Sequence, residues 1–193
     1  MVIKLIVGLG NPGQKYEKNR HNAGFLLLDG LVKDAGADFS QQARFFGGLA
    51  EVVTESGKLY LLKPATFMNR SGQSVSAVMK YFKVLPQEVL VVHDELDFDV
   101  GVVKLKKGGG HGGHNGLRDI IASMGQKDFL RLRIGIGRPR ASKVVADYVL
   151  SDFSKVDMQL VEDVFADFSA NMPAMCSGDY DIVMQNLHSR EKN

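Results

Sequence analysis

The stretch VIKLIVGLGNPG, residues 2–13, determines the kind of fold that this chain adopts. Its first part, residues 2–9, is almost entirely apolar and runs straight into a loop of Gly, Asn and Pro. A continuous apolar run of this length is typical of a strand that is buried on both faces. We therefore expect residues 2–9 to form a central strand, in a sheet that helices cover on both sides.

The rest of the chain alternates predicted helices with predicted strands. Apolar residues at helical spacing predict helices over residues 23–35, 74–82, 117–123, 156–172 and 179–187. Shorter apolar runs predict strands over residues 45–53, 58–62, 89–92, 102–105 and 129–136. The first two of these strands flank Gly57, which suits a tight hairpin turn. This order predicts an α/β fold, with a single domain over residues 1–193 and a mixed, twisted β-sheet flanked by helices.

The composition is that of an ordinary globular domain. Of the 193 residues, 45% are hydrophobic and 24% are charged. The single cysteine, Cys176, excludes an intramolecular disulfide and a cysteine-cluster metal site. No apolar run approaches the roughly 18 residues of a membrane helix, and the N-terminal run breaks too early for a signal peptide. We expect a cytoplasmic protein.

The net charge of +2 conceals an uneven distribution along the chain. Residues 1–100 are neutral in sum, residues 101–143 have a net charge of +8, and residues 144–193 have a net charge of −6. A concentrated positive region attracts polyanions over about a Debye length. The pattern is compatible with a nucleic-acid partner, and equally with a solvated surface whose charges neutralise one another.

The glycines of the first loop imitate a dinucleotide-binding motif. Residues 8–13, GLGNPG, fit the pattern G-x-G-x-x-G directly after a strand. In that motif a helix begins within the glycines, whereas Pro12 and residues 14–19 delay the helix here. A dinucleotide site and a simple structural turn are two interpretations. We favour a third, in which Asn11 presents its side-chain amide to a cleft at the edge of the sheet.

Two titratable residues far apart in the sequence are expected to meet at that edge. His21 opens a predicted helix and Asp94 follows a predicted strand, so both lie where strand ends converge. A carboxylate that orients a histidine makes it a general base near neutral pH. The chain has no Gly-x-Ser-x-Gly motif, and Cys176 lies in the acidic C-terminal part. Water is therefore the expected nucleophile.

A metal ion could activate that water instead. Asp94, Glu95 and Asp97 would be oxygen ligands of a magnesium-dependent nuclease, or His111 and His114 would be nitrogen ligands. Successive residues at the end of a strand point to opposite faces, however, and the two histidines have no third partner at a recognisable spacing. We therefore expect no metal and no cofactor.

A basic strand leads into a glycine-dense loop. Lys104 and Lys106 alternate on one predicted strand, and Arg131 and Arg133 repeat that spacing on the next. If the two strands pair, four cations share one face, which suits a phosphate. Residues 108–116, GGGHGGHNG, precede a short helix and are expected to turn backbone N–H groups toward an anion. Each lysine taken singly is more typical of a solvated strand edge.

Five motifs in order make the chain resemble one known family. They are GLGNPG at residues 8–13, RHNAG at 20–24, TFMNRSG at 66–72, HDELD at 93–97 and GGGHGGHNG at 108–116. The chain resembles the bacterial-type peptidyl-tRNA hydrolases over residues 3–137, and only weakly beyond Pro139. Members of that family cleave the ester between a peptide and the 3′ ribose of tRNA, which recycles tRNA from stalled translation. They are generally metal-free monomers with a mixed-sheet α/β fold.

The resemblance implies a role for each matching residue. His21 would remove a proton from water, Asp94 would orient His21, and Asn11 would position the water or stabilise the oxyanion. The implied substrate-binding residues are Tyr16, Met68, Asn69 and Asn115. The implied tRNA phosphate-binding residues are Lys104, Lys106 and Arg133.

The implied partner is peptidyl-tRNA, with no membrane and no obligatory protein partner. A non-catalytic RNA-binding module and a metal-dependent nuclease are the alternatives to a metal-free hydrolase. One stretch departs from the family, because residues 98–100, Phe-Asp-Val, stand where relatives often carry proline before Gly101. We expect a looser loop there. The acidic C-terminal helices match no functional motif and are expected to form a lid or a wall of the cleft.

Overall fold

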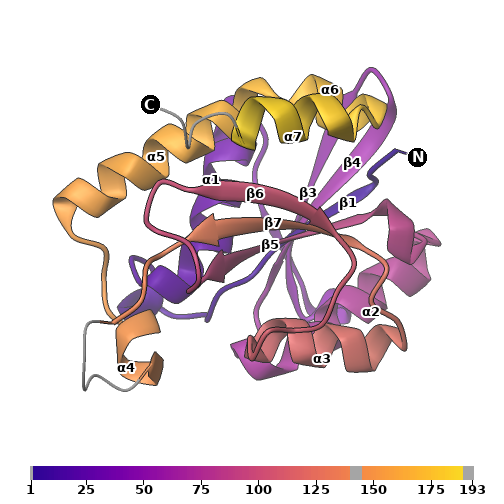
Figure 1. Ribbon diagram of the computed structural model, residues 1–193. Helices are drawn as coiled ribbons and strands as arrows, with labels where there is room; N and C mark the ends of the chain where they lie inside the picture. Colours follow the sequence, from indigo (N-terminus) through magenta and orange to yellow (C-terminus); the bar gives the residue numbers. More distant parts are fainter. Residues whose placement is uncertain (1, 140–144, 189–193) are drawn as a thin grey trace.

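The computed structural model describes residues 2–139 and 145–188, and within them a seven-stranded sheet forms the centre of the fold (Figure 1). The strands are β1 (Leu5–Gly8), β2 (Ser40–Gln42), β3 (Gly47–Thr54), β4 (Gly57–Pro64), β5 (Val89–Glu95), β6 (Val103–Lys107) and β7 (Leu130–Gly135). Their spatial order is β2-β3-β4-β1-β5-β7-β6. The pairs β1–β4, β1–β5 and β5–β7 are parallel, and the other three pairs are antiparallel. The predicted mixed α/β sheet is confirmed.

Strand β1 lies at the centre of this sheet, as its apolar sequence predicts. All four of its residues are buried. Its parallel neighbour β5 is also buried along its apolar residues, and it ends in His93, Asp94 and Glu95. Because β1 and β5 are parallel and in register at Gly8 and Val92, the loop after β1 lies next to the polar end of β5.

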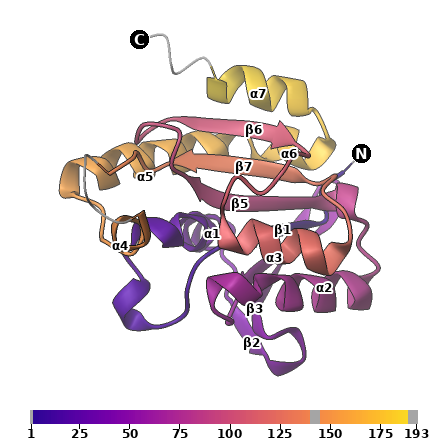
Figure 2. The ribbon, with the colours of Figure 1, turned by 60° about the horizontal axis from the view of Figure 1, so that its bottom comes forward.

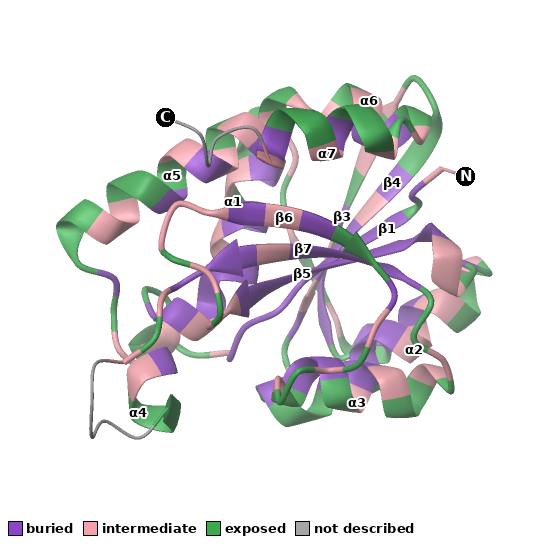
Figure 3. Cartoon of the chain, in the orientation of Figure 1, coloured by how far each residue is buried: buried purple, intermediate pink, exposed green. Residues whose placement is uncertain are grey.

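Helices cover both faces of the sheet (Figures 1 and 2). They are α1 (Ala23–Asp34), α2 (Ser71–Phe82), α3 (Asn115–Met124), α4 (Val145–Val149), α5 (Lys155–Ala170), α6 (Met172–Ser177) and α7 (Tyr180–His188). Short 3-10 turns are η1 (Gln14–Tyr16), η2 (Arg20–Asn22), η3 (Ala43–Phe45), η4 (Met68–Arg70) and η5 (Pro86–Glu88). Helices α2 and α3 share one core with the sheet, and α1, α5, α6 and α7 share the other. Buried and exposed residues alternate along these helices, as expected of layers that cover a core (Figure 3). In the described part of the chain, no helix has the length and apolar content needed to cross a membrane.

Three details differ from the sequence prediction. Strand β2 is a short polar edge strand that gives no apolar signal. Helix α4 has only five residues, too few to show a helical period. The helix expected over residues 156–172 is α5, and α6 is an additional helix of six residues that begins beside Pro173, which has no N–H to continue α5.

Gly8 at the end of β1 and Gly24 at the start of α1 allow the helix to pack tightly on the strand. A Cβ atom at Gly24 would lie 2.4 Å from the backbone nitrogen of Leu9, and a Cβ atom at Gly8 would lie 2.4 Å from the oxygen of Gly24. Only glycine permits such an approach at these two positions. The close packing brings turn η2, which carries His21, next to the loop that carries Asn11.

Candidate active site

A cleft of about 720 Å³ opens where β1 and β5 end. Its polar lining includes Asn11, His21, Asn69, Asp94, His114 and Asn115. Its apolar lining includes Phe67, Met68, Val145, Val149 and Leu150. The strand ends and helix starts that the sequence singles out therefore converge on one cleft.

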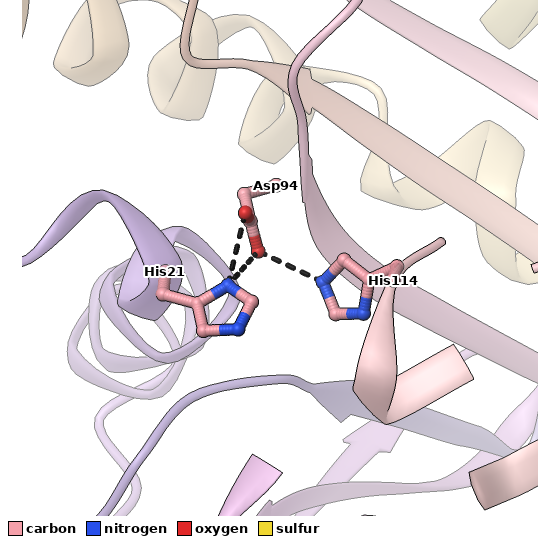
Figure 4. Close-up of side chains that lie close together, drawn as sticks. All are labelled: His21, Asp94 and His114. Carbon is pink, nitrogen blue, oxygen red and sulfur yellow. Dashed lines mark hydrogen bonds and ion pairs between the residues drawn. The ribbon is translucent and has the colours of Figure 1, made fainter. Parts of the chain in front are cut away.

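His21 and Asp94 meet on the wall of this cleft, although 73 residues separate them (Figure 4). The Nδ1 atom of His21 lies 2.9 Å from Oδ1 and 3.0 Å from Oδ2 of Asp94. Asp94 is buried, with 3% of its side chain exposed, and His21 is mostly covered, with 11% exposed. Because a carboxylate only accepts, Nδ1 carries the hydrogen and Nε2 carries the lone pair. Nε2 is thus the nitrogen that can take a proton.

His114 is a second imidazole on the same carboxylate. Its Nε2 lies 2.9 Å from Oδ1 of Asp94 (Figure 4). Its Nδ1 accepts the backbone N–H groups of Gly116 and Leu117 and caps helix α3. The ring hydrogen therefore sits on Nε2 and is donated to Asp94. The neighbours of His114 come from β5 and η2, so they stand at no recognisable sequence spacing from it, and His111 is not among the clustered residues.

We refer to His21, Asp94 and His114 as the trio. Their nearest nitrogen and oxygen atoms lie within 4.8 Å of one another, close enough to share a metal ion. A metal would need a lone pair on each nitrogen. Nε2 of His114 has none to offer while Nδ1 caps α3. As the side chains stand, the trio is a hydrogen-bond network around one carboxylate rather than a set of metal ligands.

The charges in the trio favour proton uptake by His21. Burial alone would raise the pKa of Asp94, but the charges and hydrogen bonds of His21 and His114 hold it well below its usual range. Burial also opposes a charged His21, but the charge of Asp94 and its hydrogen bond together outweigh burial and raise the pKa of His21 above its ordinary value of 6.5. A raised pKa makes the neutral imidazole a stronger base.

Asn11 is fixed so that one end of its amide is available to a ligand. Its backbone N–H donates to Oδ1 of Asn22 at 2.9 Å, and its backbone oxygen accepts from Nδ2 of Asn22 at 3.0 Å. Its side-chain Oδ1 accepts the backbone N–H of Met68 at 2.8 Å. The oxygen end of the Asn11 amide is therefore occupied, which leaves its NH2 end for the cleft.

Arg20 connects the turn that carries His21 to the C-terminal part of the chain. Its guanidinium donates to oxygen atoms of Ser151, Asp152 and Asp157. Leu150, the neighbour of Ser151, lines the cleft. Helix α4 and Leu150 therefore contribute a wall of the cleft, whereas no described residue of the acidic C-terminal helices α5 and α7, for which that role was expected, lines it.

Three of the four residues implied to bind substrate line the cleft, namely Met68, Asn69 and Asn115. Oδ1 of Asn115 accepts from Arg118 at 3.2 Å, so its NH2 end is again the one left for a ligand. Tyr16, on η1, is not among the described residues that line the cleft, and its ring lies 4.8 Å from Nζ of Lys15.

Strands β6 and β7 place four cations on one face, as predicted. Lys104 lies opposite Arg133, and Lys106 lies opposite Arg131. Arg133 forms a 3.0 Å ion pair with Glu95, which lines the cleft, so this cationic face begins at the cleft.

The loop at residues 98–100 contributes to this face. The ring of Phe98 lies 4.9 Å from Nζ of Lys104 and 4.3 Å from Cζ of Arg133. Phe98 therefore packs against both cations, a contact that no sequence pattern indicates.

Part of the glycine-dense loop uses its backbone N–H groups inside the protein and does not present them to an anion as expected. Arg131 is buried and donates to the backbone oxygens of Gly109 and Gly110. The N–H groups of Gly113 and Gly116 are bonded to histidine Nδ1 atoms within the loop. The expectation is wrong at these positions because histidine side chains already occupy the donors. Arg131 shapes the loop, and Lys104, Lys106 and Arg133 are the cations nearer to solvent.

The sequence model of the family described as Peptidyl-tRNA hydrolase matches residues 5–193. The chain belongs to the peptidyl-tRNA hydrolase family. The peptidyl-tRNA hydrolase of Neisseria gonorrhoeae (strain NCCP11945) is 48% identical over 188 residues, 97% of this chain and 98% of the relative. That of Methylococcus capsulatus is 49% identical over 97% of this chain and 100% of the relative. The crystal structure of peptidyl-tRNA hydrolase from Acinetobacter baumannii has 40% identity and a TM-score of 0.91, and the match covers 96% of this chain and 94% of that chain.

Membership of the peptidyl-tRNA hydrolase family confirms the resemblance and extends it. The motifs indicated only weak similarity beyond Pro139, whereas the family match continues to residue 193. Helices α5, α6 and α7 are therefore part of the family's fold and not an addition to it.

Proposed function

We propose that this chain hydrolyses the ester bond between a peptide, or an N-blocked amino acid, and the 3′ ribose of tRNA, and so returns tRNA to translation. Membership of the peptidyl-tRNA hydrolase family supports the substrate. The observation that carries the proposed chemistry is the buried His21–Asp94 pair in a cleft lined by asparagine side chains.

In the proposed mechanism, His21 is the general base. Its Nε2 takes a proton from water while its Nδ1–H stays bonded to Asp94, whose charge stabilises the imidazolium. The water oxygen bonds to the ester carbonyl carbon, and the C=O electron pair moves onto the carbonyl oxygen. When this intermediate collapses, the bond to the 3′ oxygen breaks and that oxygen takes the proton from His21. The neutral base is restored without a cofactor.

Asn11 stabilises the negative oxygen of that intermediate. Its NH2 end is the available donor, because its oxygen already accepts from Met68. The two hydrogen bonds with the side chain of Asn22 hold the Asn11 backbone in place before substrate arrives. A donor fixed in advance is worth more than a mobile one, because it needs no reorganisation during the reaction.

The remaining cleft residues hold the peptide without reading its sequence. Asn69 and Asn115 line the cleft and offer amide groups that suit the peptide main chain. Met68 offers an adaptable apolar surface beside them. Hydrogen bonds to main chain combined with a flexible apolar contact are compatible with many peptide sequences.

Lys104, Lys106 and Arg133 bind phosphates of the tRNA near its acceptor end. All three lie on the face that begins at Glu95 on the cleft. Because this cationic face begins at the cleft, it can hold the tRNA backbone outside the cleft while the ester at the 3′ end reaches His21.

Hydrolysis of an N-blocked aminoacyl-tRNA, measured with and without EDTA, tests the proposal. We expect release of the N-blocked amino acid, intact tRNA as the other product, and equal rates with and without the chelator. Binding of tRNA without release would favour a non-catalytic RNA-binding module. Chelator-sensitive cutting of the RNA itself would favour a metal-dependent nuclease.

The same proposal includes a monomer that acts in the cytoplasm without an obligatory protein partner. The trio and Asn11 come from a single chain and need no second copy to meet. Light scattering at the concentration of the activity assay tests this. Activity confined to a dimer would contradict it.

A further inference from the structure

His93 is a buried imidazole beside the trio that the proposed reaction does not use. Only 2% of it is exposed, and its ring meets the ring of His114 edge-on with centroids 5.0 Å apart. Its Nδ1 lies 2.7 Å from the backbone oxygen of Asp94, so Nδ1–H is the donor. Its Nε2 is buried and has no hydrogen-bond partner among the described residues.

Strand geometry explains why the backbone of Asp94 needs this donor. Backbone oxygens along a strand point alternately to its two neighbours. The oxygen of Val92 accepts from Leu9 on the β1 side, and the oxygen of Glu95 accepts from the chain after β7. The oxygen of Asp94 therefore faces the β1 side, but β1 ends opposite Val92. Nδ1–H of His93 supplies the hydrogen bond that β1 no longer offers.

We propose that His93 is a positioning residue, which fixes the peptide plane of Asp94 and supports the ring of His114 so that the carboxylate stays within reach of both imidazoles. Histidine has a cost at this position, because it buries a nitrogen, Nε2, that has no hydrogen-bond partner among the described residues. Phenylalanine would fill a similar space without that cost. The donor to Asp94 is what the site gains from having histidine here.

The state of the His93 ring agrees with this role. Burial and the neighbouring His114 lower the pKa of His93 to about 3, so the ring is neutral wherever His21 can act as a base. Because the His93 ring does not titrate near neutral pH, its Nδ1–H donates to Asp94 throughout that range and the ring does not carry protons. The inference rests on the role proposed above for Asp94.

Three substitutions at this position separate the donor from the ring. His93→Phe keeps a ring and removes the donor. His93→Asn removes the ring and keeps an NH2 group close to the place of Nδ1. His93→Gln is polar like asparagine but carries its NH2 farther out, so it serves in place of His93→Phe if that variant does not fold. His111→Phe is the matched control, since His111 lies in the cleft loop and is bonded to Gly113 and not to Asp94.

For each variant, kcat and KM are measured on an N-blocked aminoacyl-tRNA, and the titration of His21 is followed by NMR. For His93→Phe we expect kcat to fall about tenfold with KM within about twofold, since a shifted carboxylate affects the chemical step and not binding. The His21 titration should move to lower pH, because a misaligned Asp94 stabilises the imidazolium less. His93→Asn should recover most of both values, and His111→Phe should leave the titration in place.

An unchanged kcat and His21 titration in His93→Phe would overturn the inference. An equal loss in His93→Phe and His93→Asn, with the titration unmoved, would reduce His93 to a packing residue and overturn it as well. The NMR titration does not depend on turnover. If the unaltered protein did not hydrolyse the substrate, the proposed function would be wrong. The NMR titration of His21 would still show whether His93 positions His21 through Asp94.

Discussion

Replacing Asp94 with asparagine perturbs the trio with almost no change of shape. In the native site, Oδ1 accepts from His21 and from His114 at 2.9 Å each, and Oδ2 lies 3.0 Å from Nδ1 of His21. An asparagine that keeps its oxygen at Oδ1 still offers an acceptor there, but it places an NH2 group at the position of Oδ2, 3.0 Å from Nδ1 of His21. The negative charge that holds the hydrogen on Nδ1 is gone and a donor lies beside that nitrogen, so we expect His21 to move its hydrogen from Nδ1 to Nε2.

That tautomer change sets the size of the effect. With hydrogen on Nε2, His21 cannot take a proton from water. Loss of a positioned general base costs about 10²- to 10⁴-fold, or about 3 to 5 kcal/mol of activation free energy. We expect kcat/KM of Asp94→Asn to fall by about 10³-fold, within that range.

The pH dependence has a defined sign. In the native protein the rate rises with pH as His21 loses its proton, with a midpoint above 6.5 because of Asp94. Without the charge of Asp94, burial is the larger remaining influence on His21 and lowers its pKa. The residual rate of Asp94→Asn should therefore level off at a lower pH than the native rate.

The assay is release of the N-blocked amino acid from tRNA, with kcat/KM measured from about pH 5 to about pH 9 to span the titration of histidine. The control is Asp97→Asn, since Asp97 also lines the cleft but its carboxylate pairs with Arg138 and not with a histidine. If Asp94→Asn kept a rate within about threefold of the native protein, the reasoning about the tautomer and the base would be refuted.

Three further substitutions test other parts of the account. Asn11→Ala should lower kcat by about 10²- to 10³-fold through loss of the oxyanion donor. It should also lower the free energy of unfolding in urea by about 1 to 3 kcal/mol, because the N–H of Met68 loses its acceptor; an unchanged kcat would contradict the oxyanion role. Arg20→Ala should lower the free energy of unfolding by about 1.5 to 3 kcal/mol, since it removes the guanidinium hydrogen bonds to Ser151, Asp152 and Asp157, and equal stability in urea would show that the connection is not needed. Lys106→Ala should weaken tRNA binding and reduce the slope of log affinity against log salt by about 0.7 to 0.9, whereas Lys33→Ala on α1 should change neither; equal slopes would remove Lys106 from the phosphate contacts.

The sequence predicts the centre of this fold well and its margins poorly. The central strand is predictable because β1 is buried on both faces, and a buried strand must be apolar throughout. Strand β2 and helix α4 are not predictable, because a three-residue polar edge strand and a five-residue helix carry no period. The end of α5 is predictable, because Pro173 follows it, whereas α6 has only six residues and is too short to show a helical period.

The candidate site is likewise predictable in part: its central pair follows from strand topology, and the side chains around that pair do not. The meeting of His21 with Asp94 is predictable, because parallel strands end at a common edge. The place of His114 is not, because its ring replaces an ordinary capping side chain at the start of α3 and reaches Asp94 from there. The role of Arg131 in holding the glycine loop is likewise hidden, since its charge alone suggests a phosphate.

The most direct test of the central claim is the rate of His21→Ala, measured on the same preparation as its tRNA affinity and its melting temperature. If His21 is the base, hydrolysis falls by at least about 10²-fold while affinity and melting temperature stay close to the native values. Hydrolysis at the native rate by a folded, tRNA-binding His21→Ala protein would contradict the account.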